Sequence, residues 1–170
     1  MADRPLTGIL LAGGASSRFG SPKALARFEG EMLAERAWRL LDEVCQERIA
    51  VGRLEGLPLP ALEDDGTGPV AAIAEGLRNA THAVAVVVPV DMPLLTPAGL
   101  RSLADACREA AVAQAGPLPC AVARRTLPAF ETGERRLRSV LDTLDTARVE
   151  LEERQLANVN TPAQLDTLAL

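Results

Sequence analysis

The chain has 170 residues, of which 48% are hydrophobic and 24% are charged, and its formal net charge at pH 7 is −5. This length predicts a single domain over residues 1–170 with a sizeable core, and the acidic excess argues against nucleic acid as a partner. No apolar run approaches the ~20 residues of a membrane-spanning helix. The first residues lack the layout of a signal peptide, so we expect a cytoplasmic protein with no membrane partner.

Cysteine and histidine are too few for the commoner metal sites. Cys45, Cys107 and Cys120 are widely spaced and form no C-x-x-C pair, which gives little support to a zinc site or a disulfide framework. We expect Cys45 and Cys107 on apolar helical faces in the core, and His82, the single histidine, as a solvated turn residue. Any metal would then be held by oxygen ligands, which suit Mg²⁺.

Predicted strands and helices alternate along the chain. The run 83–90 is apolar without alternation, as in a parallel strand that is covered on both faces. Thr96-Pro97 has the layout of a helix start, and Thr161-Pro-Ala-Gln164 has that of a capping box. In chain order we expect strands at 8–12, 48–51, 83–90, 111–115, 120–123 and 149–151, and helices at 32–44, 70–77, from 96, at 134–144 and from 161.

This alternation predicts an α/β fold of three layers, Rossmann-like, with a mostly parallel sheet between helices on both faces. In such folds ligands bind beyond the carboxyl ends of the strands. Two conspicuous segments fall at such ends: the loop 13–23, which follows the first strand, and Asp91, which follows the strand 83–90. We therefore expect the functional site at that edge of the sheet.

Residues 9–23, ILLAGGASSRFGSPK, are the most informative stretch. The glycines let backbone N–H groups approach an anion, and Arg18 and Lys23 add positive charge, so the loop predicts phosphate binding. Gly20 is followed by Ser-Pro, which excludes a P-loop, and the glycine spacing excludes the dinucleotide fingerprint. A plain glycine-rich turn is the alternative, which the complete string makes the less favoured one.

Asp91 lies in the string Val88-Pro-Val-Asp-Met-Pro93. A carboxylate at the tip of a buried strand is held rigidly and suits a Mg²⁺ ion that also binds substrate phosphates. On its own, Asp91 could equally cap the following turn. A phosphate loop at the same edge of the sheet favours the metal.

Three further segments are less specific. Asp64, in the acidic and glycine-rich run 63–69, could hydrogen-bond a guanine or ribose or bind a metal, although a solvated loop is somewhat favoured. Asn158 and Asn160 share one face of an extended segment and could grip a polar ligand or satisfy a turn. The arginines of 133–136 oppose the dipole at a predicted helix start, which is compatible with an anionic partner, although a solvated face is the commoner explanation.

Together these strings resemble the molybdopterin nucleotidyltransferases, a family within the nucleotide-diphospho-sugar transferase fold. The resemblance covers nearly the whole chain. Gly-Glu-Arg-Arg-Leu-Arg and Asn-Val-Asn-Thr-Pro are the more particular strings and resemble the molybdenum cofactor guanylyltransferase branch. The matching segments, in the family's order, are 11–23, 66–69, 90–93, 117–122, 133–138 and 158–162.

The resemblance implies an enzyme that transfers GMP from Mg-GTP to the terminal phosphate of molybdopterin, releasing pyrophosphate and forming molybdopterin guanine dinucleotide. It implies catalytic roles for Arg18 and Lys23 on the triphosphate and for Asp91 as the ligand of Mg²⁺, the one cofactor expected. Molybdoenzyme apoproteins or other cofactor-biosynthesis proteins are the protein partners that it suggests. It further implies guanine or ribose contacts for Leu11, Ala12, Gly13 and the adjoining Gly14, nucleoside contacts for Asp64, and molybdopterin contacts for Asn158 and Asn160.

Two departures from the family's pattern bear on the choice of nucleotide. Pro22 stands where many guanylyltransferases carry Asp, and Pro-Lys is frequent in relatives that use CTP. The end of the second strand reads Ala50-Val-Gly-Arg53, without the asparagine common there. The alternatives are therefore a molybdopterin cytidylyltransferase, another small-molecule nucleotidyltransferase or, from a different class, a non-catalytic nucleotide-binding regulatory domain.

Overall fold

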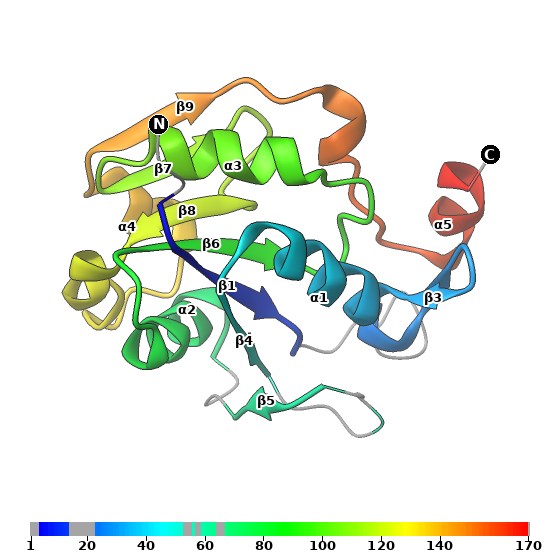
Figure 1. Ribbon diagram of the computed structural model, residues 1–170, viewed down its shortest axis with the longest axis horizontal. Coiled ribbons are helices and arrows are strands. Elements are labelled where there is room, and N and C mark those ends of the chain that lie inside the picture. Colours follow the sequence, from blue (N-terminus) through cyan, green and yellow to red (C-terminus); the bar gives the residue numbers. More distant parts are fainter. Residues whose placement is uncertain (1–3, 14–22, 53–55, 57–58, 64–66, 170) are drawn as a thin grey trace.

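The computed structural model describes residues 4–13, 23–52, 56, 59–63 and 67–169. In this part of the chain a seven-stranded sheet has the order β5-β4-β1-β6-β8-β7-β9 (Figure 1). Its strands run parallel except β8, which is antiparallel to both β6 and β7. The strands are β1 (Leu6–Leu11), β4 (Glu47–Val51), β5 (Ala61–Leu62), β6 (Val84–Pro89), β7 (Ala110–Ala113), β8 (Cys120–Ala123) and β9 (Thr146–Val149).

Helices connect most of these strands, as the alternating pattern predicts. A short hairpin of β2 (Arg27–Phe28) and β3 (Glu31–Met32) precedes the first of them. The α-helices are α1 (Leu33–Val44), α2 (Pro69–Asn79), α3 (Pro97–Ala106), α4 (Leu137–Asp142) and α5 (Pro162–Leu168), and the 3₁₀ helices are η1 (Lys23–Leu25), η2 (Arg124–Phe130) and η3 (Glu153–Leu156). The three-layer α/β fold is confirmed.

The two faces of the sheet carry separate cores. Successive side chains of a strand point to opposite faces, so Leu10 of β1 and Val86 of β6 pack with α1 and α3, whereas Ile9 and Val87 pack with α2, α4 and η2. All four side chains are fully buried. Burial of a side chain of this size contributes about 1.5–3 kcal/mol, which explains why both layers of helices stay on the sheet.

Two predicted elements are shifted in the structure, each for a local reason. The helix expected from 134 begins at Leu137, because the Glu134 carboxylate accepts a hydrogen bond from the Arg136 N–H at 2.8 Å and Gly133 has φ +91°. The strand expected at 149–151 is Thr146–Val149. It ends there because the Gln114 amide bonds both backbone groups of Leu151, at 2.6 and 3.0 Å.

Cys45 and Cys107 lie in the core, as predicted, but just beyond helices and not within them. Cys45 and Cys107 are the residues that cap the carboxyl ends of α1 and α3, and Cys120 begins β8. All three are buried free thiols. His82 is half-buried in a bend before β6. None of the helices in the described part of the chain is long and apolar enough to span a membrane.

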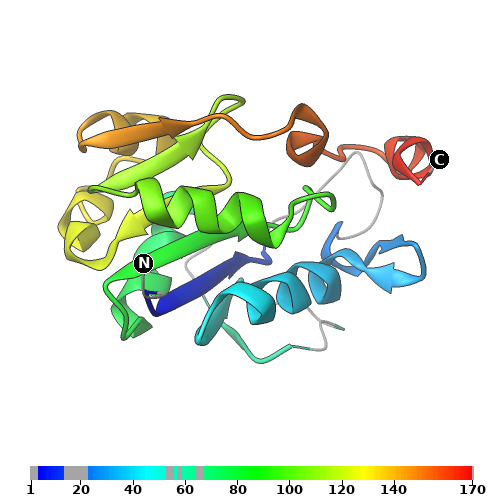
Figure 2. The ribbon, with the colours of Figure 1, turned by 45° about the horizontal axis from the view of Figure 1, so that its top comes forward.

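The parallel strands end together at one edge of the molecule. Figure 1 shows α5 and the β2–β3 hairpin on the side toward which the arrowheads of β1 and β6 point, and Figure 2 shows the same arrangement from a second angle. The hairpin follows η1, which begins at Lys23, and α5 follows the segment 157–161. This edge therefore gathers segments from the beginning, the middle and the end of the chain.

Candidate active site

At this edge of the sheet, the backbone segments that follow β1 and β4 come very close to each other. The Ala12 N–H donates to Val51 O at 2.9 Å, just where β1 and β4 end. Beyond it a Cβ on Gly13 would lie 2.8 Å from the Gly52 Cα, and a Cβ on Gly52 would overlap the backbone N and Cα of Gly13. Gly52 also has φ +101°, a conformation that favours glycine. Glycine at both positions is what lets the two backbone segments pass this closely.

Three polar side chains meet at the same edge of the sheet. The Lys23 Nζ lies 3.4 Å from Asp91 Oδ2 and 3.2 Å from Asn160 Oδ1. The Lys23 side chain is 18% exposed and the Asp91 side chain 26% exposed, so the cluster is sheltered but still open to a ligand. We call Lys23, Asp91 and Asn160 the lysine cluster. The structure thus brings together three residues that the sequence predicted separately.

The backbone around Asp91 explains why Asn160 reaches this cluster. The Val159 N–H donates to the Asp91 carbonyl oxygen at 2.8 Å, which fixes the segment before α5 against the end of β6. Val159 is fully buried, whereas Asn158 is exposed and Asn160 half-buried. This alternation agrees with the predicted placement of the two asparagines on one side of an extended segment.

The capping box predicted at the start of α5 is present. The Gln164 N–H donates to Thr161 Oγ1 at 3.3 Å, and Gln164 Oε1 accepts from the Thr161 N–H at 3.2 Å. The same Oε1 also accepts from the Asn160 N–H at 2.5 Å. The cap therefore extends one residue beyond α5 and bonds the backbone of a member of the lysine cluster.

Arg36 on α1 is a residue of this region that no sequence pattern indicated. Its Nε donates to the Pro93 carbonyl oxygen at 2.7 Å, and its guanidinium carbon lies 4.8 Å from the centroid of the Phe28 ring. It also forms an ion pair with Glu29 at 3.4 Å. Arg36 therefore ties the β2–β3 hairpin, which follows Lys23, to the loop that begins at Asp91. Its partners lie far apart in sequence, so only the folded structure reveals the role.

The donors of the lysine cluster fit a magnesium ion that a nucleotide would bring with it. Mg²⁺ is usually held by one or two carboxylates together with substrate phosphates and water. Asp91 supplies one partly exposed carboxylate, and Asn160 adds a neutral amide oxygen. Among the described residues no three His, Cys, Asp or Glu side chains group together as a metal cage would require. The site therefore fits a shared, hydrated ion.

The other predicted site residues are placed only in part. Leu11 is half-buried and Ala12 is buried at the end of β1, and Gly13 is exposed next to them. The predicted residues Gly14, Arg18 and Asp64 lie outside the described residues. Gly52 and Gln164 are positions to which no site role was assigned from the sequence. A glycine directly after an apolar strand was the available signal for Gly52.

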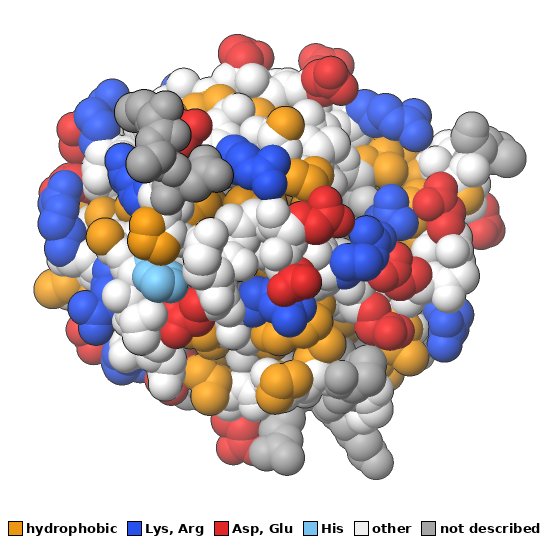
Figure 3. All heavy atoms as spheres, in the orientation of Figure 1, with side chains coloured by type: hydrophobic (Ala, Val, Ile, Leu, Met, Phe, Trp, Pro, Cys, Tyr) orange, Lys and Arg blue, Asp and Glu red, His pale blue; other side chains and the backbone are white. Residues whose placement is uncertain are grey.

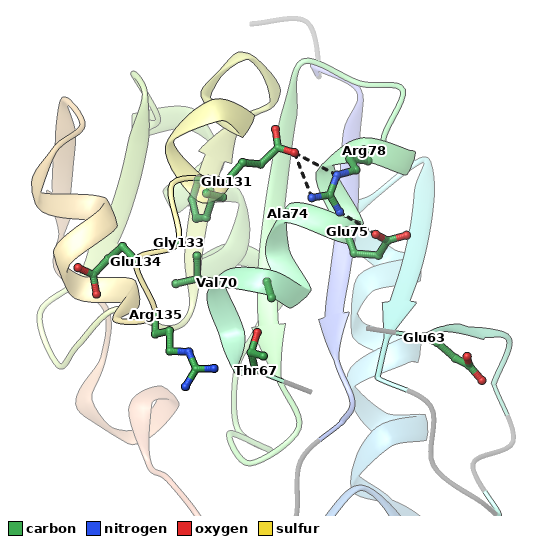
Figure 4. A pocket seen from close by; sticks show the side chains of 12 residues that line it. Glu63, Thr67, Val70, Ala74, Glu75, Arg78, Glu131, Gly133, Glu134 and Arg135 are labelled. Carbon is green, nitrogen blue, oxygen red and sulfur yellow. Dashed lines mark hydrogen bonds and ion pairs between the residues drawn. The ribbon is translucent and has the colours of Figure 1, made fainter. Parts of the chain in front are cut away.

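A hollow of about 540 Å³, whose lining contains none of the lysine-cluster residues, runs along α2 (Figure 4). At one end Arg78 pairs with Glu75 at 2.8 Å and with Glu131 at 3.1 Å. Arg135 borders the hollow from the segment before α4, and it has no ion-pair partner among the residues that the structure describes. Among the described residues that line it, carboxylates outnumber cations, which disfavours a phosphate ligand beside them: Glu63, Glu75, Glu131 and Glu134 against Arg78 and Arg135.

Comparison with known proteins shows which family this chain resembles. The family model for the MobA-like NTP transferase domain matches residues 8–150. The molybdenum cofactor guanylyltransferase of Xanthomonas euvesicatoria pv. vesicatoria is 35% identical, with 97% of this chain and 95% of that protein covered. A probable molybdenum cofactor guanylyltransferase of Deinococcus radiodurans is 34% identical, with 97% and 94% covered.

Solved structures share the fold at lower sequence identity. Molybdopterin-guanine dinucleotide biosynthesis protein A from Archaeoglobus fulgidus has a TM-score of 0.79 at 22% identity, with 96% of each chain covered. A nucleotidyl transferase from Methanothermobacter thermautotroptrophicus has a TM-score of 0.82 at 19% identity, with 97% of this chain and 96% of that chain covered. From the match over residues 8–150 and the identity along nearly its whole length, the chain belongs to the MobA-like NTP transferase family.

Proposed function

We propose that this protein is a molybdenum cofactor guanylyltransferase, which transfers GMP from GTP to the terminal phosphate of molybdopterin and releases pyrophosphate. We assign this activity to one nucleotidyltransferase domain over residues 1–170. The observation that carries the proposal is the lysine cluster at the carboxyl edge of the sheet, in a chain 35% identical to a protein of that name. The cluster offers a cation and a carboxylate to a ligand that carries phosphates.

The proposed reaction needs no nucleophile from the protein. A phosphate oxygen of molybdopterin, already anionic at neutral pH, forms a bond to the α-phosphorus of GTP, and the bond from that phosphorus to the bridging oxygen of pyrophosphate breaks. The protein aligns the two substrates and neutralises charge, as in phosphoryl transfer generally. This agrees with a chain that contains one histidine, half-buried in a bend before β6.

Each side chain of the site has a distinct task in this proposal. The Lys23 ammonium offsets charge that develops on the α-phosphate and on the departing pyrophosphate. Asp91 would hold Mg²⁺, which supplies further charge neutralisation on the phosphates. We assign Arg18 to the triphosphate as well. The nucleoside would contact the backbone of Leu11, Ala12, Gly13 and Gly14 and the Asp64 side chain, and molybdopterin would lie against Asn158 and Asn160.

The first test compares nucleotides directly. The protein is incubated with Mg²⁺, molybdopterin and each of the four nucleoside triphosphates in turn, and released pyrophosphate is measured. We expect release with GTP, and label from α-labelled GTP in a molybdopterin dinucleotide. Faster release with CTP would assign the cytidylyl reaction instead. Tight GTP binding without pyrophosphate release would refute catalysis and indicate a regulatory domain.

The setting of the reaction is also proposed. We place it in the cytoplasm, with molybdoenzyme apoproteins as recipients of the product, because a protein-bound cofactor is of use only once it reaches the enzyme that employs it. A pull-down of the purified protein with a molybdenum-free apoenzyme, with and without GTP and molybdopterin, measures binding between the two proteins, and activation of the apoenzyme measures delivery of the cofactor. Loss of cofactor delivery when the two proteins are kept apart by a membrane supports direct contact.

A further inference from the structure

Lys23 is the only lysine in the chain. Its ammonium has three donors at the end of a flexible four-carbon stem, so more than one acceptor is needed to hold it in one place. Two acceptors in the structure are Asp91 Oδ2 at 3.4 Å and Asn160 Oδ1 at 3.2 Å. Where the ammonium lies therefore depends on where the Asn160 amide lies.

The backbone of Asn160 is held from both sides. On one side the neighbouring Val159 is fully buried, and its N–H donates to the Asp91 carbonyl at 2.8 Å. On the other side the Asn160 N–H donates to Gln164 Oε1 at 2.5 Å. Gln164 is itself fixed, because its own N–H donates to Thr161 Oγ1 at 3.3 Å and its side chain caps the Thr161 N–H.

We propose that Gln164 is a positioning residue for Lys23, acting through the Asn160 backbone. Its side chain is exposed, and its hydrogen bonds run to the backbone of residues 160 and 161, so it would otherwise count as a plain helix cap. Removal of its oxygen frees the Asn160 N–H, and the Asn160 amide then no longer faces the ammonium in one orientation. The consequence for nucleotide binding rests on the proposed function of Lys23.

The single lysine permits a direct measurement. Protein grown with ¹³C,¹⁵N-lysine gives one lysine side-chain signal by NMR, and that signal reports the surroundings of the Lys23 ammonium in the nucleotide-free protein. Gln164→Ala removes the acceptor, whereas Gln164→Glu keeps a side-chain oxygen in the capping box. Asp166→Ala is the matched control, since Asp166 is exposed on the same helix and its side chain forms no hydrogen bond or ion pair with the described residues. The spectrum of Asn160→Ala gives the position of the Lys23 signal when the Asn160 amide is absent.

We expect the Lys23 signal of Gln164→Ala to move most of the way to its position in Asn160→Ala. The signals of Gln164→Glu and Asp166→Ala stay near that of the unmodified protein. An unmoved signal in Gln164→Ala overturns the proposal, and so does an equal movement in Asp166→Ala, which would show a general response of α5. Circular dichroism establishes that each variant is folded before the spectra are compared.

Nucleotide binding separates this proposal from the proposed function. If Lys23 binds the triphosphate, Gln164→Ala raises the Kd for GTP about 2- to 10-fold, as expected for loss of one hydrogen bond, and Gln164→Glu restores it. A lysine signal that moves while the Kd for GTP stays unchanged supports the positioning role and contradicts the phosphate-binding role of Lys23. A lysine signal that does not move contradicts the positioning role whatever GTP does.

Discussion

At the scale of single residues, the ion pair between Lys23 and Asp91 is better suited to function than to stability. Both side chains are partly exposed, and ion pairs of this kind contribute only about 0–1 kcal/mol. The protein therefore loses little when a ligand separates them. In the proposed function a triphosphate would bind the Lys23 ammonium, and the Asp91 carboxylate would then be available to Mg²⁺.

Removal of either charge should lower activity strongly without unfolding the protein. We expect Lys23→Ala and Asp91→Asn each to lower turnover at least ~10²-fold, the effect of losing one electrostatic stabiliser. Thermal unfolding should change little, because the pair contributes little to stability. Pyrophosphate release and the melting temperature are the two measurements.

Asp145→Asn is the matched control for Asp91→Asn. Asp145 also pairs with a cation, Arg108, at 2.9 Å, but it lies just before β9, at the amino end of that strand. Activity close to that of the unmodified protein is expected for it. Near-normal turnover in Asp91→Asn would contradict the metal-binding role.

At the scale of elements, the site depends on how neighbouring segments are spaced. The ends of β1 and β4 touch through Gly13 and Gly52, Arg36 joins α1 to the loop after β6, and Val159 joins the last segment to Asp91. Arg36, Gly52 and Val159 carry none of the proposed chemistry. Arg36 and Val159 hold segments next to Asp91 in place, and Gly52 lets the end of β4 pack against Gly13.

Gly52→Ala should therefore disturb both folding and activity. The substitution costs about 1–3 kcal/mol for the positive φ, and the added Cβ overlaps the backbone of Gly13. Gly30→Ala is a matched control, because Gly30 has φ +81° but open space within 4 Å of the position that a Cβ would take. Urea denaturation should show a larger loss for Gly52→Ala. Equal losses would mean that the contact with Gly13 has no energetic consequence.

Arg36→Lys tests the link between the hairpin and the Asp91 loop. Lysine keeps the charge but loses the Nε donor to Pro93 and the planar contact with Phe28. We expect kcat/KM to fall about 2- to 10-fold, as for one lost hydrogen bond. Arg39→Lys, on the same helix and paired with Glu31 at 3.0 Å, should leave kcat/KM unchanged. A similar fall in both variants would assign the effect to α1 as a whole.

At the scale of the whole molecule, charged side chains lie on the surface, whereas the thiols lie in the interior. Figure 3 shows basic and acidic side chains interspersed over the face that carries α1 and α3. The three thiols lie in the interior instead, where desolvation raises the pKa of Cys45 and Cys120 to about 12 and that of Cys107 to about 11. The native protein thus keeps its thiols protonated well above neutral pH.

Stability should fall in alkaline solution for this reason. A cysteine in the unfolded chain has a pKa of about 8.5, so between about pH 9 and the folded values the unfolded state releases protons that the native state retains. The free energy of unfolding then decreases as the pH rises. Thermal unfolding from pH 7 to pH 11 measures the trend, and Cys120→Ala should show a shallower decrease. An identical slope in that variant would contradict the contribution of Cys120.

Much of the fold follows from local patterns in the sequence. The apolar run 83–90 and the threonine caps at Thr96 and Thr161 each predict their element from neighbouring residues alone. The antiparallel direction of β8 was not predicted, although residues 114–119 are too few for a crossover between parallel strands. The start of α4 was misplaced because a single carboxylate, Glu134, competes with the helix.

The candidate site likewise contains residues that local sequence patterns indicate and residues that they do not. Lys23, Asp91 and Asn160 could be predicted because each lies in a recognisable string, and the structure brings them together. Arg36 and Gly52 could not, since their roles arise from contacts with Pro93 and Gly13 that only the folded chain creates. We expect Arg36 and Gly52 to affect the site through the spacing of neighbouring segments and not through chemical reactivity.

The single lysine has a practical consequence for handling the protein. Amine-reactive dyes, amide-forming crosslinkers and reductive methylation can modify no side-chain amine other than that of Lys23, beside the α-amine. Coupling the protein to a surface through its amines would therefore fasten it partly by its own proposed substrate site. Attachment through an added tag avoids this loss, and protection of the amine by GTP during labelling would give a quick chemical assay of occupancy.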